Sequence, residues 1–350
     1  MSTFAETLIT WQSRHGRHDL PWQTRDAYRV WLSEIMLQQT QVDTVIPYYA
    51  RFLARFPDLP SLAAAPVEDV LTLWSGLGYY ARARNLHKCA QTLMARHGGI
   101  FPADPVLLAE LPGIGRSTAA AISAFAYGTR AAILDGNVKR VLARVFGIEG
   151  FPGTKPVENR LWELAESLLP VSNVDVYTQA QMDLGATVCT RGRPACARCP
   201  LADVCVALRD GRVAELPTRR PKKEARERRG RFAAILADGS VLLERRPPSG
   251  IWGGLLSLPE LPEDADTVDW VASRYGLEVR KVTALASFRH VFTHFTLTLE
   301  PESVEVGTRS NCAEPGLLWH PLDKLEEAAL PAPIRKLLEQ LVRHELFSPA

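Results

Sequence analysis

The spacing of apolar residues over the first 210 positions constrains the fold more than any other feature of this chain. From about residue 4 to residue 210, apolar side chains recur at intervals of three and four, as at Val30, Trp31 and Ile35. This spacing gathers them on one face of a helix and predicts helices throughout the region. Proline and glycine interrupt the pattern repeatedly, which favours short helices joined by turns. An all-α N-terminal region is therefore expected.

The pattern changes after LPTRRPKKEARERRG (216–230), a basic, proline-containing stretch typical of an exposed linker. Beyond it, RFAAILADGSVLLERR predicts two strands joined by an Asp238-Gly239 turn, and FRHVFTHFTLTLEP predicts another alternating strand. Short helices are expected at 266–276 and 332–346. The C-terminal part is therefore predicted to be a separate α+β domain.

The charge of the chain is unevenly distributed. Residues 1–231 hold 30 Lys/Arg against 22 Asp/Glu, whereas the remainder holds 11 against 17. The first part therefore favours a polyanionic partner and the second does not. No apolar run is long enough to span a bilayer, and the N-terminus lacks the pattern of a signal peptide. We expect no membrane association and a cytoplasmic location, on the nucleoid if the source is bacterial.

The turn LPGIGRSTA (111–119) allows three interpretations. A Walker phosphate loop needs a lysine that is absent here, and a dinucleotide fingerprint needs a preceding strand and a third glycine. The third interpretation is a tight hairpin between two helices. Gly113 and Gly115 would allow the turn, and the next helix would offer unpaired N–H groups to a phosphate. On these residues alone, a purely structural turn stays open.

Two carboxylates are candidates for chemistry. Glu34 follows Val30 by four residues and precedes Leu37 by three, so it interrupts an apolar helical stripe. Burial there would raise its pKa and make it a proton donor near neutral pH, whereas a place at the exposed edge of the stripe would not. Asp135 stands at a predicted helix start, where the role of an N-cap alone would explain it.

Four of the six cysteines fall in the single segment CTRGRPACARCPLADVC. Cys189, Cys196, Cys199 and Cys205 have the spacing C-x6-C-x2-C-x5-C. Four thiolates in one loop of a protein without a secretion signal predict a metal centre rather than disulfides. Zinc and a [4Fe–4S] cluster both accept four cysteines, and the spacing does not choose between them. Cys89 and Cys312 are expected to be plain buried thiols.

Together these motifs resemble the helix-hairpin-helix DNA glycosylases of the endonuclease III superfamily. LPGIGRSTA, LDGNVKR and the cysteine loop carry this resemblance. Four further stretches are similar to the adenine-excising MutY family: LPWQ (20–23), WLSEIMLQQTQV (31–42), WSGLGYYARARNLHK (74–88) and RPPSGIWGG (246–254). The resemblance covers nearly the whole chain. It implies a multi-domain protein with an all-α helix-hairpin-helix glycosylase core, an iron–sulfur cluster loop and a C-terminal α+β Nudix-like domain.

The resemblance also implies where these parts begin and end. The helical glycosylase region is expected at 1–210, with a six-helix barrel module at about 25–135. The N-terminal helix and residues 136–210 would form the iron–sulfur module. A basic linker at 211–230 would lead to the lesion-recognition domain at 231–350.

The resemblance implies a reaction as well. Members of the family excise adenine mispaired with 8-oxoguanine or guanine in base excision repair, hydrolysing the N-glycosidic bond of a base flipped out of the duplex. DNA carrying those mispairs is the implied partner, with one [4Fe–4S] cluster and a monomeric chain. By this resemblance Glu34 protonates N7 of adenine, Asp135 stabilises the sugar cation and Asn137 orients the sugar. Relatives that cut the backbone have lysine where Ser117 stands, and serine cannot form an imine, so no strong lyase activity is expected.

The other implied site residues contact the base, the DNA or the opposite lesion. Trp22, Gln23 and Gln179 match the adenine pocket, Leu37 and Tyr79 match wedge positions, and Gln39 with Thr40 match positions near the oxidised guanine. Gly113, Gly115, Arg191, Arg193 and Arg198 are expected at phosphates. His290, Val291, Phe292, Thr293 and His294 match the loop that recognises 8-oxoguanine, with threonine where serine is common. On the residues alone, Tyr79 could equally belong to a core, and the His290 loop to an ordinary strand.

Three rival functions conflict with particular residues. A bifunctional glycosylase/lyase for oxidised pyrimidines conflicts with Ser117 and with the C-terminal domain. A non-catalytic lesion binder would not need both Glu34 and Asp135. A nucleotide pyrophosphatase needs the R-E-x-x-E-E glutamates that hold magnesium, and residues 260–280 contain no such cluster.

Overall fold

The computed structural model describes residues 3–221, 226–292, 295–309 and 316–347, excluding the side chains of 344–347. Contacts divide the chain into two units. The first comprises Met1–Ala64 and Asn85–Lys222, and the second comprises Ala65–Arg84 and Lys223–Ala350. The change of unit after residue 222 lies inside the basic linker expected at 211–230. None of the described helices is both long and apolar enough to cross a membrane.

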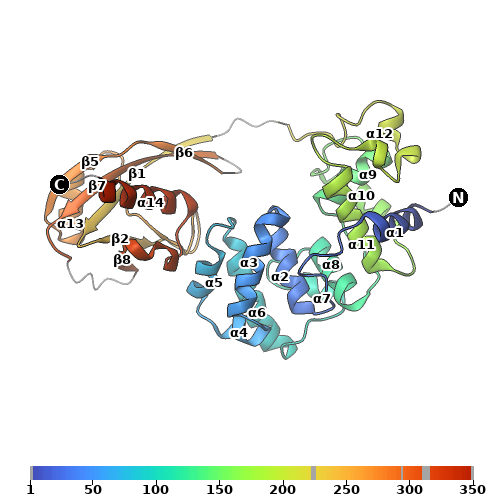
Figure 1. Ribbon diagram of the computed structural model, residues 1–350, viewed down its shortest axis with the longest axis horizontal. Helices are drawn as coiled ribbons and strands as arrows, with labels where there is room; N and C mark the ends of the chain where they lie inside the picture. Colours follow the sequence, from blue (N-terminus) through green and yellow to red (C-terminus); the bar gives the residue numbers. More distant parts are fainter. Residues whose placement is uncertain (1–2, 222–225, 293–294, 310–315, 348–350) are drawn as a thin grey trace. The chain divides into compact units, whose positions relative to one another are not determined.

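The first unit is helical throughout its described residues, as the apolar spacing predicts (Figure 1). Its α-helices are α1 (Phe4–His15), α2 (Ala27–Leu37), α3 (Val42–Arg55), α4 (Leu59–Ala64), α6 (Ala81–His97, beginning in the second unit), α7 (Pro105–Ala109), α8 (Arg116–Tyr127), α9 (Gly136–Val145), α10 (Lys155–Ser167), α11 (Val174–Asp183) and α12 (Val206–Arg209). A π-helical turn, η1 (Leu184–Val188), and two 3₁₀ turns, η2 (Cys196–Arg198) and η3 (Ala202–Val204), complete it.

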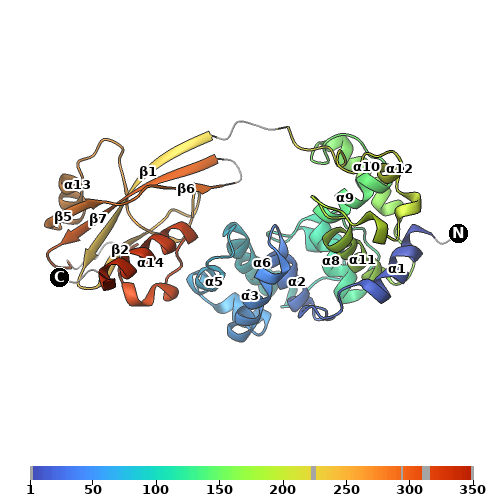
Figure 2. The same ribbon diagram turned by 45° about the horizontal axis from the view of Figure 1, so that its top comes forward.

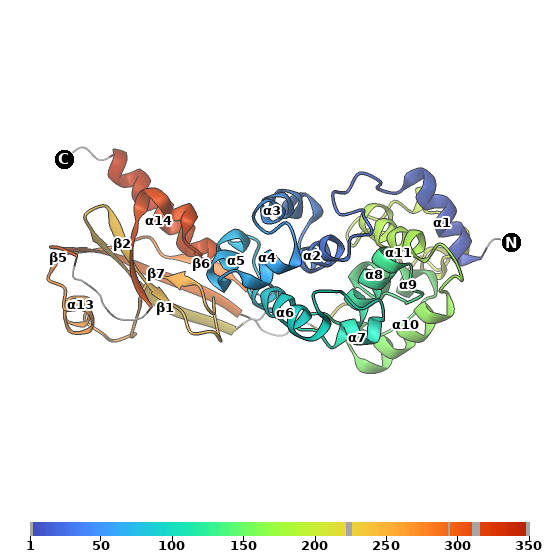
Figure 3. The same ribbon diagram turned by 90° about the horizontal axis from the view of Figure 1, so that it is seen from below.

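Two clusters of buried side chains hold these helices together. In one, Leu8 and Trp11 of α1 pack with Tyr177 of α11, and α9 and η1 add further apolar residues. In the other, α8, α9 and α10 share a core around Leu142 and Leu161. Figure 3 shows α8 beside both α9 and α11. The helix that starts at the Gly-x-Gly turn and the helix that starts after Asp135 are therefore packed in the same core.

The hairpin between α7 and α8 has the form expected for LPGIGRSTA. Gly113 has φ +79°, and a Cβ atom there would approach Cβ of Asn85 to 2.8 Å, so this position favours glycine on two grounds. Gly115 is the N-cap of α8 and supplies no side-chain hydrogen bond to the first N–H groups of the helix. A Cβ atom on Gly115 would meet open space. The N-terminus of α8 is therefore accessible.

The second unit is built on a mixed sheet (Figure 2). Its strands are β1 (Arg226–Ala237), β2 (Ser240–Arg245), β3 (Leu256–Ser257), β4 (Glu260–Leu261), β5 (Val279–Ala284), β6 (Phe288–Val291), β7 (Phe295–Val306) and β8 (Leu317–Pro321). The principal order is β3-β2-β1-β7-β5, with β4 on β1, β6 on β7 and β8 on β2. Among the strands that the structure describes, only β1 and β7 pair in parallel. Helices α5 (Val67–Trp74), α13 (Thr267–Tyr275) and α14 (Ala332–Phe347) and the 3₁₀ turn η4 (Leu322–Glu327) accompany the sheet.

The predicted hairpin is confirmed as β1 and β2. Asp238 and Gly239 have φ values of +46° and +67°, the sign that a type I′ turn requires at both central positions. The segment FRHVFTHFTLTLEP differs from the prediction of one strand, because it forms the separate antiparallel strands β6 and β7. The helices expected at 266–276 and 332–346 are α13 and α14.

Residues 65–84 pack with the C-terminal residues of the same unit. The carbonyl oxygen of Leu330 accepts hydrogen bonds from the hydroxyls of Ser75, at 2.9 Å, and Tyr80, at 3.3 Å. Arg84 Nη1 donates to the carbonyl oxygen of Gly253 at 2.5 Å. The turn that carries Tyr79 is therefore attached to the sheet-containing unit.

Candidate active site and cysteine centre

Helix α2 presents Glu34 to a cavity of about 390 Å³ in the helical unit. Asp26 caps the helix by accepting hydrogen bonds from the N–H groups of Tyr28 and Arg29. Val30, Glu34 and Leu37 all line the cavity, in agreement with the single helical face on which their spacing places them. The cavity is large enough for a purine base.

The environment of Glu34 favours its protonated form. Burial, and secondarily the nearby negative charge of Asp135, raise the pKa of Glu34 from its ordinary 4.5 to about 8. The side chain is half-buried, with protein around it and one side open to the cavity. At neutral pH the carboxyl therefore carries a proton that it can donate.

Asp135 is the N-cap of α9. Its Oδ1 accepts a 2.8 Å hydrogen bond from the N–H of Val138, and its Oδ2 accepts one of 3.2 Å from Nδ2 of Asn137. Burial raises the pKa of Asp135, while these hydrogen bonds act in the opposite direction. The negative charge of Asp135 also raises the pKa of Glu34, so the two carboxyls lie within electrostatic range of each other.

The walls of the cavity come from segments far apart in the sequence. Trp22 is buried and packs edge-on against Tyr49 at 5.5 Å, and Gln23 and Gln179 also line the cavity. The Gln23 side chain holds its own loop, since Oε1 accepts from the N–H of Leu20 and Nε2 donates to the carbonyl oxygen of Arg17. The pocket residues expected from the sequence are thus brought together.

The sequence analysis did not predict three residues in or behind the cavity wall: Asp183, Gln12 and Arg17. Asp183 is completely buried, and its carboxylate accepts hydrogen bonds from Gln12 Nε2 at 2.9 Å, Gln179 Nε2 at 2.8 Å, and both the backbone N–H and the guanidinium of Arg17. Gln12 and Arg17 themselves line the cavity. The interval of four residues between Gln179 and Asp183 on one helix was an available signal.

The expected wedge and gap-filling residues lie in different places. Leu37 is in the cavity wall, whereas Gln39 is exposed with φ +58° and neither it nor Thr40 lines the cavity. Tyr79 belongs to the second unit, is 48% exposed and has φ +50°. A large, exposed aromatic side chain on a strained backbone is unusual for a core residue, which argues against the core interpretation.

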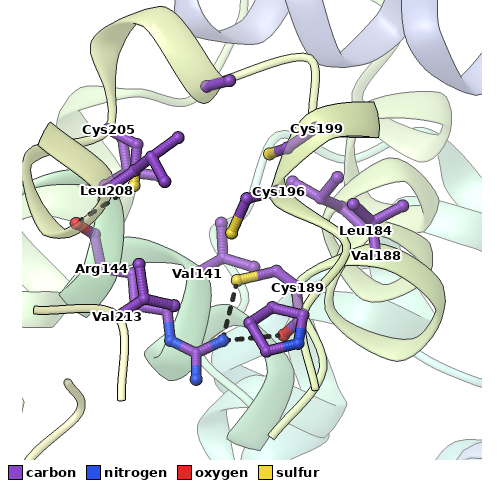
Figure 4. Close-up of a pocket in the computed structure, with 13 residues that line it drawn as sticks. Val141, Arg144, Leu184, Val188, Cys189, Cys196, Cys199, Cys205, Leu208 and Val213 are labelled. Carbon is purple, nitrogen blue, oxygen red and sulfur yellow. Dashed lines mark hydrogen bonds between the residues drawn. The ribbon is translucent and has the colours of Figure 1, made fainter. Parts of the chain in front are cut away.

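The four cysteines of the loop line one pocket in the helical unit, between apolar walls that include Val141, Leu184 and Val188 (Figure 4). Cys189 follows η1, Cys196 begins η2, and Cys199 and Cys205 end the two 3₁₀ turns. Among the described residues, no three His, Cys, Asp or Glu side chains converge as a ligand group for a single metal ion. Four thiols lining one pocket are a donor set that either a zinc ion or a [4Fe–4S] cluster accepts.

Two arginines connect this pocket to the rest of the site. Arg144 is buried, and its Nη1 donates to Sγ of Cys189 at 3.3 Å and to the carbonyl oxygen of Thr190 at 2.8 Å. Arg140 donates to the carbonyl oxygen of Cys189 and to Oδ1 of Asn137, both at 2.7 Å. Because Asn137 contacts Asp135, a continuous chain of hydrogen bonds joins the cysteine loop to that carboxylate.

Cys89 has the buried position expected for it, and the basic residues of the cysteine loop are exposed. Cys89 is fully buried, and burial raises the pKa of its thiol to about 12. Cys312 lies outside the described residues. Arg191, Arg193 and Arg198 are exposed, as phosphate-binding side chains need to be.

The loop expected to read the opposite lesion is described only in part. Phe292 is half-buried and stacks on Phe295, with 4.5 Å between the ring centroids. The ring centroids of Trp252 and His290 lie 6.0 Å and 4.7 Å from that of Phe292, and the His290 ring meets it edge-on. Val291 is 73% exposed. Thr293 and His294 lie outside the described residues. Of the expected loop, His290 and Val291 therefore lie in β6, and Phe292 follows it within an aromatic cluster.

Two family models match the chain. The model described as HhH-GPD superfamily base excision DNA repair protein matches residues 32–167, and the NUDIX domain model matches residues 231–340. Among solved structures, a thermostable thymine-DNA glycosylase aligns with a TM-score of 0.54 at 30% identity, covering 59% of this chain and 95% of that one. A non-covalent endonuclease III–DNA complex aligns with a TM-score of 0.51 at 21% identity, covering 59% and 94%, which is a likeness of fold.

Curated relatives match along nearly the whole length. The adenine DNA glycosylase of Buchnera aphidicola subsp. Baizongia pistaciae is 36% identical over 345 residues, covering 97% of this chain and 96% of the relative. The adenine DNA glycosylase of Homo sapiens is 32% identical over 402 residues, covering 96% and 73%.

Fold, site and relatives together define a base excision repair DNA glycosylase with a helix-hairpin-helix core and a Nudix-like C-terminal domain. A DNA N-glycosylase of this class hydrolyses the bond between a base and its sugar. Within the class, the chain belongs to the adenine DNA glycosylase family, so the base that it removes is adenine.

Proposed function

We propose that this enzyme excises adenine paired with 8-oxoguanine or guanine, that Glu34 and Asp135 carry the chemistry, and that the product is an intact strand with an abasic site. The observation that carries the proposal is the raised pKa of Glu34, about 8, in a cavity large enough for a base and within electrostatic range of Asp135. One protonated and one ionised carboxyl can act as an acid and an anion at the same pH.

The reaction follows from the poor leaving ability of the adenine anion. Glu34 donates its proton to N7, so that the bond between C1′ and N9 breaks with its electron pair on a neutral base. The sugar becomes an oxocarbenium-like cation, which the Asp135 carboxylate stabilises across the site. Water then attacks C1′ and gives up a proton to the Glu34 carboxylate, which restores the acid for another turnover.

The hairpin and the cysteine loop are proposed to hold the DNA. The accessible N-terminus of α8 after Gly115 offers N–H groups to a backbone phosphate, and the three exposed loop arginines add positive charge. Cys189, Cys196, Cys199 and Cys205 would hold a [4Fe–4S] cluster, which supplies a redox-active link within the loop and no step of the hydrolysis. The Phe292 loop is proposed to contact the base opposite the adenine.

One assay tests the proposal. Duplexes with a labelled adenine strand opposite 8-oxoguanine, guanine or thymine are incubated with enzyme, and half of each sample is treated with alkali. We expect breaks only after alkali, and faster excision opposite 8-oxoguanine and guanine than opposite thymine. Equal rates on all three duplexes would contradict the proposed partner base, and breaks without alkali would contradict the hydrolytic outcome.

A further inference from the structure

We infer that Asp183 is a positioning residue that sets the base specificity of the cavity, by fixing the side-chain amide of Gln179 so that its oxygen is available as an acceptor. The selected ligand is a purine with an exocyclic amino group at position 6. The inference rests on the proposed use of this cavity to bind the flipped base.

The first step of the reasoning concerns Gln179. Its Nε2 donates to Oδ1 of Asp183 at 2.8 Å, and a flip of the amide would instead bring Oε1 against the carboxylate. The carboxylate accepts but cannot donate when it is ionised, so only one orientation is favourable. Gln179 lines the cavity, and its remaining amide oxygen is an acceptor.

Gln12 is fixed by the same carboxylate. Its Nε2 donates to Oδ2 of Asp183 at 2.9 Å, and a Cβ atom on Gly16 would lie only 2.1 Å from its amide, so the space beside it is filled by backbone. The side chain is 3% exposed, and Oε1 is buried without a hydrogen-bond partner among the described residues. Because Oε1 of Gln12 has almost no exposed surface, the acceptor that a ligand can reach is the amide oxygen of Gln179.

Asp183 also holds a loop that lines the cavity. Its carboxylate accepts from the backbone N–H of Arg17 at 2.9 Å and from Nε at 2.8 Å. The carbonyl oxygen of Arg17 in turn accepts from Gln23, the neighbour of the buried wall residue Trp22. One carboxylate thus orients residues in two helices and a loop, and no part of it is exposed to solvent.

The chemistry of the ligand follows from the Gln179 acceptor. Adenine offers N–H donors at position 6, whereas hypoxanthine has a carbonyl oxygen there and unsubstituted purine has no polar group. A site whose buried acceptors lose their donor discriminates strongly against such analogues. Asp183 therefore determines specificity without a place in the proton transfers.

The test measures single-turnover excision of adenine, hypoxanthine and unsubstituted purine from otherwise identical duplexes. In Asp183→Asn, an amide replaces the carboxylate and can donate to either glutamine oxygen, so the fixed orientation is lost. We expect the preference for adenine over unsubstituted purine, relative to wild type, to fall by about tenfold. Asp210→Asn changes an exposed aspartate in the same unit that is paired with Arg209, and should leave the preference unchanged.

Gln179→Leu leaves the hydrogen bonds of Asp183 to Gln12 and Arg17 in place. If Asp183→Asn does not fold, this second variant tests the inference. It should reduce the same preference, and in the folded double variant the two losses should not add. An unaltered preference in either folded variant overturns the inference. If wild-type enzyme does not excise adenine at all, the proposed function fails instead.

Discussion

The hydroxyl oxygen of Ser117 accepts a 2.9 Å hydrogen bond from the backbone N–H of Leu134, the residue immediately before Asp135. This bond joins the start of α8 to the segment that presents the carboxylate. Leu134 is buried, so its N–H group has no access to solvent as an alternative. Ser117 therefore satisfies a buried backbone N–H group, at a position where the amine of a lysine would allow strand cleavage.

Replacing Ser117 with lysine should add strand cleavage to base excision. The new amine would stand on the second residue of α8, close to Asp135, and could attack C1′ to form an imine that leads to strand breakage. Breaks without alkali and a borohydride-trapped protein–DNA adduct would show this activity. Ser117→Ala is the matched control. It should give no adduct, and it should lower the free energy of unfolding by about 1–3 kcal/mol because the Leu134 N–H is left unpaired. A lysine variant with no adduct would place the sugar out of reach of this position.

Excision should slow as pH rises through the pKa of Glu34. That pKa is about 8, so the acid form is lost above this value. Single-turnover rates against pH should therefore have an alkaline limb near pH 8. Glu34→Gln cannot donate a proton, and its rate should fall by about 10²–10⁴-fold and lose this limb. A wild-type rate that stays level to about pH 9 would remove Glu34 from the role of acid.

The same group should make the stability of the protein depend on pH. The folded-state pKa of Glu34 is raised from 4.5 to about 8, so the folded state binds the proton more tightly than the unfolded state does. Stability from this group is therefore complete below about pH 4.5 and is lost as pH rises to about 8. Glu34→Gln should melt at a higher temperature than wild type at about pH 9, with the difference shrinking toward about pH 5. Parallel melting curves at all pH values would contradict the burial of the charge.

Asp135→Asn should separate the two tasks of this side chain. Asparagine is as good an N-cap as aspartate and can still accept from the N–H of Val138, so α9 and the melting temperature should change little. The negative charge is lost, and the excision rate should fall by about 10²–10³-fold. Full activity in a folded Asp135→Asn protein would limit this residue to capping.

The cysteine pocket makes a prediction about colour and composition. Protein purified without oxygen should absorb visible light and contain equal amounts of iron and acid-labile sulfide, near four of each per chain. Cys196→Ala should lose this absorption and melt at a lower temperature, whereas Cys89→Ala, outside the pocket, should keep the absorption. Zinc at one atom per chain, with no colour, would overturn the cluster assignment.

The local features of the site were predictable from the sequence, and the long-range ones were not. The position of Glu34 in an apolar stripe predicted its raised pKa, and the spacing of the cysteines predicted a shared pocket. The Asp238-Gly239 turn fixed the β1–β2 hairpin. By contrast, Gln12 and Arg17 reach Asp183 across 171 and 166 residues, and no local pattern encodes such pairs. The adjacent apolar residues Val291 and Phe292 interrupt the alternation after Phe288, a signal of the division into β6 and β7 that the prediction of one strand did not use.

The attachment of residues 65–84 to the sheet-containing unit affects how shortened proteins are interpreted. The carbonyl oxygens of Leu330 and Gly253 accept hydrogen bonds from the side chains of Ser75, Tyr80 and Arg84. A fragment that ends near residue 222 lacks those carbonyl oxygens. The turn with Tyr79 would then lose the contacts that support it, while its own sequence stayed intact. Weak activity in such a fragment would thus have two possible causes, a displaced Tyr79 or the absence of the domain that contacts the opposite base. Supplying only the 246–254 loop and Leu330 on a small scaffold, without the rest of the domain, would distinguish these two causes.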